Sequence, residues 1–411
     1  MKIAVMGCGI VGSGAVEIAE DLAASIAERC YEKEVEVKYI LDIRDLSDKP
    51  YASKVIKDVD IIVNDPEIGV VVETMGGTEP AFTFCMKCMN AGKSVVTSNK
   101  QLVAEKAEEL FAAAKKNNVC FRFGASVCGG IPVIRTLFTG MAADEIVSFA
   151  GILNGTTNFI LTKMISEKMS FEAALKLAQE KGYAEKDPTA DIEGFDACRK
   201  TAILSSIAFG KHIRPEEIHT EGITAVTLED AAYAENYGAA IKLLGRAAKR
   251  PDGKINAIVS PVFVKKDTLI SGVSGVFNAL SVTGSKVGEL MLYGQGAGKD
   301  ATASAVMADV LDCIRDKGFT PVYSWENGTG NDVCDYLGYE TRLYVRGYAK
   351  NKNAAVSDIR ESFGGVKVLS RENAPENEIA FVTGKEKEGA LRETLAGLKD
   401  FAPASVIRIF E

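Results

Sequence analysis

The sequence predicts an α/β protein that begins with a doubly wound, mostly parallel β-sheet. Short β-branched and apolar runs alternate with longer stretches at helical spacing over the first 135 residues. Such alternation is typical of a parallel sheet with helices on both faces. The first run, KIAVMG, leads directly into a glycine-rich turn and a long helix. A different pattern, richer in consecutive strands, begins near residue 150.

The alternation divides the first region into elements of ordinary length. Strands are expected at 2–7, 35–43, 68–77, 94–100 and 120–127. Helices are expected at 11–33, 79–93 and 102–117. We place the first domain at 1–135 and expect a later helix, at 299–318, to pack back onto it.

The sequence predicts a second domain at 136–324, of α+β type. Ser170 can cap a helix that stops before Gly182, and another helix is expected at 195–209. Branched residues divided by glycine and proline then predict an antiparallel sheet. Its strands are expected at 240–250, 255–264, 276–284 and 289–294.

The last part of the chain predicts a small third domain. Residues 325–338, WENGTGNDVCDYLG, have the composition of a linker. Residues 339–411 then give the order βαββαβ, which is typical of a ferredoxin-like unit.

Composition restricts the kind of protein. The 411 residues are 47% hydrophobic and carry a net charge of −8, which argues against nucleic acid or an anionic membrane as the main partner. Nine scattered cysteines suit a reducing compartment, and no apolar run reaches transmembrane length. KIAVMG is already a strand, so we expect a cytoplasmic protein without a signal peptide. With only two histidines, a histidine-based metal site or a Ser-His-Asp triad is poorly supported.

Gly7, Gly9 and Gly12 form a G-x-G-x-x-G motif between the first strand and the first helix. The motif alone is a weak signal, but this position gives it meaning, because the helix N-terminus favours a pyrophosphate. The sequence therefore predicts a Rossmann-like dinucleotide-binding domain. A glycine turn that binds nothing is the less favoured alternative.

The end of the second strand, LDIRDLSDK, bears on the choice of dinucleotide. Asp42 favours the ribose 2′-hydroxyl of NAD, whereas Arg44 and Lys49 favour the 2′-phosphate of NADP. We lean to NADP, with NAD as the alternative.

A dense charge cluster, EKDPTADIEGFDACRK, precedes and enters the helix at 195–209. Helical geometry puts Asp196, Lys200, Ile203 and Ile207 on one stripe of a helix that is apolar or small nearly all round. The Asp196–Lys200 pair, four residues apart, is then expected to be buried. Buried charge pairs of this kind collect at sites of chemistry, although a solvated charge run is the commoner explanation of such a segment.

These motifs resemble those of homoserine dehydrogenases with a C-terminal ACT-type regulatory domain. The similar segments, in chain order, are SNKQLVA, GGIP, GILNGTTNFIL, EKDPTADIEGFDACRK and GQGAGKDATA. The resemblance implies NAD(P)-dependent interconversion of L-aspartate 4-semialdehyde and L-homoserine, a step toward threonine and methionine. It also implies a homodimer or higher homo-oligomer.

The resemblance implies roles for particular residues. Lys200 would be the acid–base group, with Asp196 orienting it. Glu185 and Asp191 would contact the substrate, and Lys100 would serve substrate, cofactor and catalysis. The residues implied to face the cofactor are Gly7, Gly9, Ile10, Val11, Gly12, Arg44, Lys100 and Gly298.

The resemblance also implies a monovalent cation at the backbone of Val127, Gly129 and Ile131. The family often has a glutamate just upstream, where this chain has Gly124. In the third domain, the family's DxxG turn after the first strand is replaced by AKNKNAAVSD. Without that glycine, close backbone contact with an amino-acid effector is harder, so we expect weak or absent threonine feedback.

Two other functions remain to be compared. An acylating aldehyde dehydrogenase would need an activated cysteine, and Cys128 in SVCGGIP is the candidate near a strand end, with no histidine nearby in sequence. A non-catalytic dinucleotide sensor, or another NAD(P)-dependent dehydrogenase of amino-acid metabolism, is the second alternative. A sensor would give the charge cluster around Lys200 no purpose.

Overall fold

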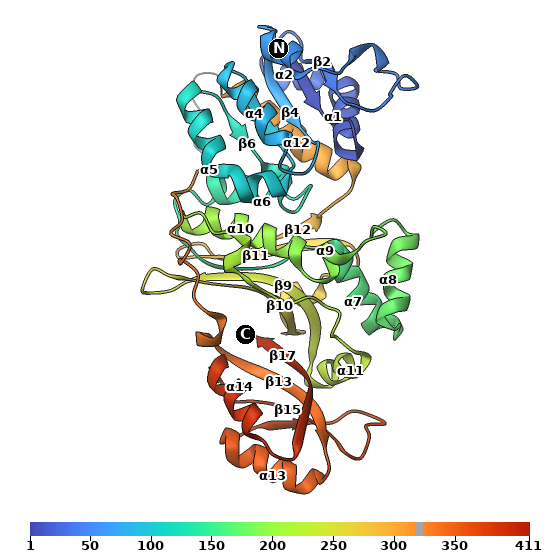
Figure 1. Cartoon of the computed structure of the whole chain (residues 1–411), viewed down its shortest axis with the longest axis vertical. Helices are drawn as coiled ribbons and strands as arrows, with labels where there is room; N and C mark the ends of the chain where they lie inside the picture. Colours follow the sequence, from blue (N-terminus) through green and yellow to red (C-terminus); the bar gives the residue numbers. More distant parts are fainter. Residues whose placement is uncertain (317–323) are drawn as a thin grey trace. The chain divides into compact units, whose positions relative to one another are not determined.

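The computed structural model describes residues 1–316 and 324–411 and divides the chain into two compact units. The first unit contains residues 1–145, 202–214 and 292–329, and the second contains 146–201, 215–291 and 330–411. The predicted α/β region lies in the first unit, and the predicted antiparallel and βαββαβ regions lie in the second (Figure 1).

The first unit is built on a parallel sheet in the order β3-β2-β1-β4-β5-β6. Its strands are β1 Lys2–Met6, β2 Glu36–Leu41, β3 Val55–Ile56, β4 Ile68–Glu73, β5 Ser94–Thr97 and β6 Phe121–Arg122. The strand order reverses between β1 and β4, and open α/β sheets bind ligands outside the carboxyl ends of the strands at such a point. The prediction of an α/β fold with a parallel sheet is confirmed here.

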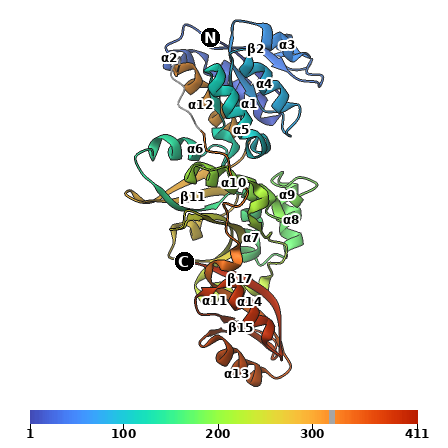
Figure 2. The ribbon, with the colours of Figure 1, turned by 60° about the vertical axis from the view of Figure 1, so that its left-hand side comes forward.

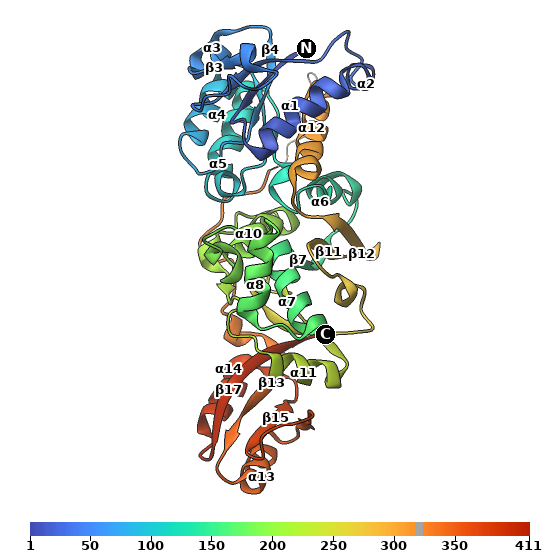
Figure 3. The same ribbon diagram turned by 90° about the vertical axis from the view of Figure 1, so that its right-hand side faces the viewer.

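Helices cover both faces of this sheet. The helices of this unit are α1 Ile10–Asp21, α2 Ala23–Arg29, α3 Val59–Asn64, α4 Ala81–Asn90, α5 Lys100–Asn117, α6 Val133–Arg135 and α12 Lys299–Arg315. Short helical turns lie at Ala52–Lys54, Gly124–Ser126 and Thr136–Gly140. Although α12 is remote in sequence, it lies beside α1 and shares its core (Figure 3). A Cβ at Gly14 would come within 2.9 Å of the Ala303 Cβ, so the two helices approach closely because both residues are small.

Several predicted boundaries in this unit were wrong. The helix expected at 11–33 is interrupted at Leu22. The strand expected at 120–127 ends at Arg122, because the Gly124 amide donates to Asp309 and the Ser126 hydroxyl donates to the Phe123 carbonyl, which turns the chain. The strand expected at 94–100 ends at Thr97, and Lys100 begins α5 instead.

The second unit contains one sheet in the order β12-β11-β7-β9-β10-β17-β13-β15-β14. The strands of its first half are β7 Ile146–Ile152, β8 His219–Thr220, β9 Ala239–Lys249, β10 Ile255–Lys265, β11 Phe277–Gly284 and β12 Gly288–Gln295. β9 and β10 pair antiparallel, as the sequence predicts, and β8 adds to β10. β7, which was not predicted, pairs antiparallel with both β9 and β11. The helices are α7 Gly155–Glu167, α8 Phe171–Glu180, α9 Thr189–Ile192 and α11 Leu228–Tyr237, and α10 Phe195–Phe209 begins in this unit and ends in the first. Pro215–Glu217 and Leu269–Gly272 form single turns.

The end of the chain has the predicted βαββαβ order. Its elements are β13 Glu340–Ala349, α13 Lys352–Phe363, β14 Lys367–Leu369, β15 Glu378–Val382, α14 Glu388–Gly397 and β17 Phe401–Phe410, with a short β16 Glu386–Lys387 (Figure 2). α13 and α14 pack onto these strands through a shared apolar core. β17 pairs in parallel with β10, so the sheet of this segment continues the sheet of the preceding strands.

The predicted linker, which lies wholly within the described residues, contains no long helix or strand. Within 325–338 the Val333 region pairs with Ile255 and a single turn forms at Tyr336–Gly338, so this segment is tied to the fold without long elements. The helix expected at 299–318 is observed at Lys299–Arg315, and its last two predicted residues lie outside the described residues.

Candidate functional site

The glycine-rich turn between β1 and α1 is tight and open on one side. Gly7 has a φ of +88°, which favours glycine, and a Cβ at Gly12 would lie 1.9 Å from the Gly7 carbonyl oxygen. Ile10, the first residue of α1, is 71% exposed. The turn therefore presents backbone N–H groups at a helix N-terminus, which fits the pyrophosphate of a dinucleotide.

Asp42 and Arg44, at the end of β2, are held together. Arg44 donates from Nη2 to Asp42 Oδ2 at 2.6 Å and from Nε to Asp42 Oδ1 at 2.9 Å. The Arg44 side chain holds the pKa of the Asp42 carboxyl well below its ordinary value. Because the carboxylate also accepts the Cys8 amide at 2.7 Å, Asp42 fixes the glycine turn and Arg44 together.

A cation that sequence reasoning missed supports this loop. Lys57 Nζ donates to the carbonyl oxygens of Asp42 and Arg44, at 2.8 and 2.6 Å. Lys49, the second cation considered for a 2′-phosphate, pairs instead with Asp48 at 2.8 Å. Lys57 follows β3, a two-residue strand that no sequence pattern revealed.

The carboxyl ends of β4 and β5 are locked around a buried glutamate. The Thr97 hydroxyl donates to Glu73 Oε2 at 2.5 Å, and the Met75 amide donates to Glu73 Oε1 at 2.7 Å. Burial raises the pKa of the Glu73 carboxyl. Asn99 then caps α5 by accepting the Leu102 amide, so Lys100 stands in the first turn of a well-anchored helix.

The loop of the expected cation site turns sharply. Cys128 and Gly129 both have positive φ, +58° and +47°, and the Ile131 carbonyl accepts the Val133 amide at 2.7 Å. A Cβ at Gly124 would lie 2.8 Å from Asp309 Oδ2. The Asp309 carboxylate thus occupies the space where a longer side chain at 124 would begin. The Cys128 side chain is fully buried, which disfavours it as the nucleophile of an acylating enzyme.

Gly298 caps the N-terminus of α12 with a φ of +116°. The next residue, Lys299, donates from Nζ to both Glu17 carboxylate oxygens at 2.6 Å. This ion pair ties the start of α12 to α1, the helix that follows the glycine turn.

The charge cluster predicted from the sequence forms in the second unit. Lys200 Nζ lies 2.8 Å from Asp196 Oδ2 and donates to the Leu153 carbonyl at 2.7 Å. Asp196 is 3% exposed and Lys200 is 9% exposed, so the predicted burial of this pair is confirmed. A buried ammonium held by one carboxylate and one carbonyl can deliver a proton or stabilise negative charge on a nearby oxygen.

A buried asparagine, also missed from the sequence, joins two carboxylates of this cluster. Asn154 Nδ2 donates to Asp191 Oδ1 at 2.7 Å and to Asp196 Oδ2 at 2.8 Å. The structure therefore brings Asp191, Asp196 and Lys200 together. The only sequence signal for Asn154 was its place in GILNGTTNFIL, where an asparagine before a helix suggests a cap.

Glu185, the other predicted substrate contact, lies on the loop between α8 and α9. Its side chain is exposed, and its backbone carbonyl accepts the Gln179 side chain at 3.1 Å. α8, which precedes this loop, lies beside α7 (Figure 3). An exposed carboxylate on such a loop can reach the ammonium group of a small substrate.

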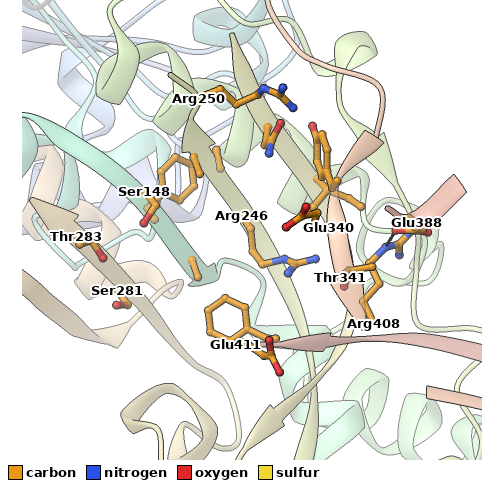
Figure 4. A pocket seen from close by; sticks show the side chains of 18 of the residues that line it. Ser148, Arg246, Arg250, Ser281, Thr283, Glu340, Thr341, Glu388, Arg408 and Glu411 are labelled. Carbon is orange, nitrogen blue, oxygen red and sulfur yellow. Dashed lines mark hydrogen bonds and ion pairs between the residues drawn. The ribbon is translucent and has the colours of Figure 1, made fainter. Parts of the chain in front are cut away.

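A separate cavity of about 840 Å³ lies elsewhere in the second unit. Arg246, Arg250, Glu340, Arg408 and Glu411 are among its lining residues, and Figure 4 shows Arg246 near its centre. None of the residues singled out from the sequence lines it. The cavity is thus distinct from the cluster around Lys200.

The described residues contain neither a metal-binding cluster nor a membrane-spanning helix. Within 1–316 and 324–411, no three or more histidine, cysteine, aspartate or glutamate side chains gather in a way that could hold a metal ion. Over the same part of the chain, no helix combines the length and apolarity needed to cross a membrane.

Comparison with known proteins decides the family. The profile described as homoserine dehydrogenase matches residues 132–311, and the one described as homoserine dehydrogenase, NAD binding domain, matches 7–124. The homoserine dehydrogenase of Synechocystis is 36% identical, over 100% of this chain and 99% of its own. The chain belongs to the homoserine dehydrogenase family. It is an NAD(P)-dependent oxidoreductase that interconverts L-aspartate 4-semialdehyde and L-homoserine, a step of amino-acid biosynthesis.

Other relatives agree with this membership. The Bacillus subtilis homoserine dehydrogenase is 36% identical, over 97% of this chain and 95% of its own. A crystal structure of a homoserine dehydrogenase from Thiobacillus denitrificans matches with a TM-score of 0.90 at 35% identity, over 100% of this chain and 98% of that chain. A hyperthermophilic archaeal homoserine dehydrogenase in complex with NADPH matches with a TM-score of 0.65 at 29% identity, over 76% of this chain and 97% of that chain. The alternative of a non-catalytic sensor is not favoured.

Proposed function

We propose that Lys200 is the general acid–base group of this homoserine dehydrogenase and that Asp196 orients it. Hydride addition to an aldehyde builds negative charge on its oxygen, which needs a proton. The observation that carries the proposal is the buried ion pair of Lys200 with Asp196 at 2.8 Å, with a further hydrogen bond from Lys200 to the Leu153 carbonyl. Held in this way, the ammonium has a fixed direction in which to give a proton to the aldehyde oxygen, or to take one from homoserine in reverse.

The amino-acid end of the substrate needs groups of both charges. We assign its ammonium to Glu185 and Asp191, whose carboxylates precede α10. Its carboxylate requires a cation, and Lys100 is the proposed partner, as well as a contact of the cofactor. Asn99 caps α5, so the backbone of Lys100, the first residue of that helix, has a fixed position.

The proposed cofactor is NADP, with NAD as the alternative. When bound, the nicotinamide supplies or accepts the hydride. Gly7, Gly9, Ile10, Val11 and Gly12 suit its pyrophosphate by the geometry of their turn, and Gly298 is the proposed contact on the later glycine-rich turn. Arg44 is the proposed partner of the 2′-phosphate. The relative in complex with NADPH adds support to this choice.

The remaining assignments are also proposals. We place the nucleotide-binding domain at 1–135, the substrate-binding and dimerisation domain at 136–324, a linker at 325–338 and an ACT-like regulatory domain at 339–411. The sheet order β17-β13-β15-β14 supports the last of these. A cytoplasmic homodimer or higher homo-oligomer with little threonine feedback is expected. A monovalent cation at the backbone of Val127, Gly129 and Ile131 stays a prediction. Gly124 stands where the family often has a glutamate, which argues against this cation site.

The test is the turnover of Lys200→Ala with homoserine and NADP. We expect kcat to fall by roughly two orders of magnitude or more, the scale for losing a general acid–base group, with cofactor affinity little changed. Arg199→Ala is the matched control, because it removes the neighbouring cation of the same helix. Near-parental kcat in a folded Lys200→Ala protein would refute the assignment.

A further inference from the structure

The connection between β7 and α7 meets the cluster at three points. The Leu153 carbonyl accepts Lys200 Nζ at 2.7 Å. The Asn154 side chain donates to Asp191 at 2.7 Å and to Asp196 at 2.8 Å. Leu153 thus contacts Lys200, and the next residue, Asn154, contacts Asp191 and Asp196.

The Asn154 amide is used completely. Its Oδ1 accepts the Thr157 amide at 2.9 Å and so caps the N-terminus of α7, while both donated bonds go to carboxylates 37 and 42 residues away. Capping requires only the oxygen. The Asn154 nitrogen therefore has a second role besides capping. It holds the two carboxylates at a set separation and offsets part of their repulsion.

The place from which Asn154 acts is rigid. Ile152, the last residue of β7, pairs with Ala279 of β11, and Asn154 itself is 5% exposed. A Cβ at Gly155 would lie 2.7 Å from the Val276 carbonyl oxygen, so the first residue of α7 is pressed against the segment before β11. The Asn154 side chain accordingly has little freedom to follow a displaced carboxylate.

We infer that Asn154 is a positioning residue, which sets the Lys200–Asp196 pair and the substrate-binding carboxylate of Asp191 in register through one bridging amide. This inference rests on the proposed function of those three residues. Asn154 touches no reacting atom in this account. It fixes Asp196, which orients the proton donor, and Asp191, which holds the substrate, so that proton and aldehyde oxygen meet.

Asn154→Asp and Asn154→Ser separate positioning from capping. Both residues are good helix caps, so α7 should keep its start. Serine removes the bridge without adding charge, whereas aspartate adds a third carboxylate against the other two. Like charges raise the pKa of neighbouring carboxyls, so the acidic limb of the kcat profile should move to higher pH in Asn154→Asp.

The expected result is a fall in kcat of roughly 10-fold to 100-fold in both variants, the scale for residues that orient reacting groups at metal sites. Tm should stay close to that of the parent in Asn154→Ser and fall in Asn154→Asp, because a third buried carboxylate faces two others, so kcat is expressed per folded protein. Asn351→Asp is the matched control, because Asn351 caps α13 in the same way by accepting the Ala354 amide at 3.2 Å. It should change neither kcat nor the pH profile.

Parental kcat and an unmoved acidic limb in Asn154→Asp would overturn the inference. So would losses in both variants that only follow the fraction of folded protein. Lys200→Ala, measured alongside, keeps the two claims apart. If Lys200→Ala is inactive while the Asn154 variants are normal, only the positioning role fails, and if Lys200→Ala is active, the proposed function fails.

Discussion

Replacing Arg44 by alanine tests which dinucleotide the turn after β2 selects. In the structure the Arg44 guanidinium makes two bonds to Asp42, at 2.6 and 2.9 Å, while its side chain is 55% exposed. An exposed, pre-oriented guanidinium can bind a 2′-phosphate without first being ordered. A hydrogen bond to a charged group contributes about 1.5–3 kcal/mol, so its loss should weaken NADP binding by roughly 10-fold to 100-fold.

The same change should leave NAD binding unharmed or improve it. Without the guanidinium, the Asp42 carboxylate still accepts the Cys8 amide at 2.7 Å and becomes available to a ribose 2′-hydroxyl. Fluorescence titration of the parent and Arg44→Ala with each reduced cofactor measures both effects. Lys49→Ala serves as a control, because Lys49 is paired with Asp48 and should have a small effect. Equal losses for the two cofactors would refute the contact between Arg44 and the 2′-phosphate.

Three further predictions follow from buried groups and from the C-terminal segment. Burial raises the pKa of Asp309 to about 7, so the folded protein binds a proton that the unfolded chain has lost, and stability should fall as pH rises from about 4 to 7, by at most roughly 4 kcal/mol. Asp309→Asn should flatten this fall in Tm, and an unchanged slope would contradict it. Asp230→Asn should destabilise the fold by roughly 3–5 kcal/mol in denaturant titration, because Asp230 bonds buried Arg346 at 2.8 Å; a loss below about 1 kcal/mol would count against this. Millimolar L-threonine should leave the rate of the full chain nearly unchanged, and strong inhibition would show that the turn before α13 binds an effector.

The sequence predicted the fold well where local pattern and burial agree. The glycine motif before α1 and the long stripe of α10 are local features, and both were located closely. Short elements failed, because a two-residue strand such as β3 has no periodicity to detect. The end of β6 failed for a different reason, since the bond from Gly124 to Asp309 joins residues 185 apart in sequence.

The candidate site could likewise be predicted from the sequence only in part. The Asp196–Lys200 pair follows from helical spacing, because the two residues lie on one helix. Asn154 could not be found by this route, since its partners lie on other elements and reach it only through the tertiary fold. Lys57 was missed likewise, because it contacts backbone carbonyls of a neighbouring strand end rather than a charged side chain.

Lys200→Arg tests most directly whether Lys200 transfers a proton. Arginine keeps the positive charge but cannot give up a proton near neutral pH. The measurement is the rate of reduced-cofactor oxidation in a single turnover with L-aspartate 4-semialdehyde, for the parent, Lys200→Arg and Lys200→Ala. Lys200→Arg should be slowed nearly as much as Lys200→Ala, by roughly two orders of magnitude. A Lys200→Arg rate close to that of the parent would contradict proton transfer by Lys200, because charge alone would then suffice.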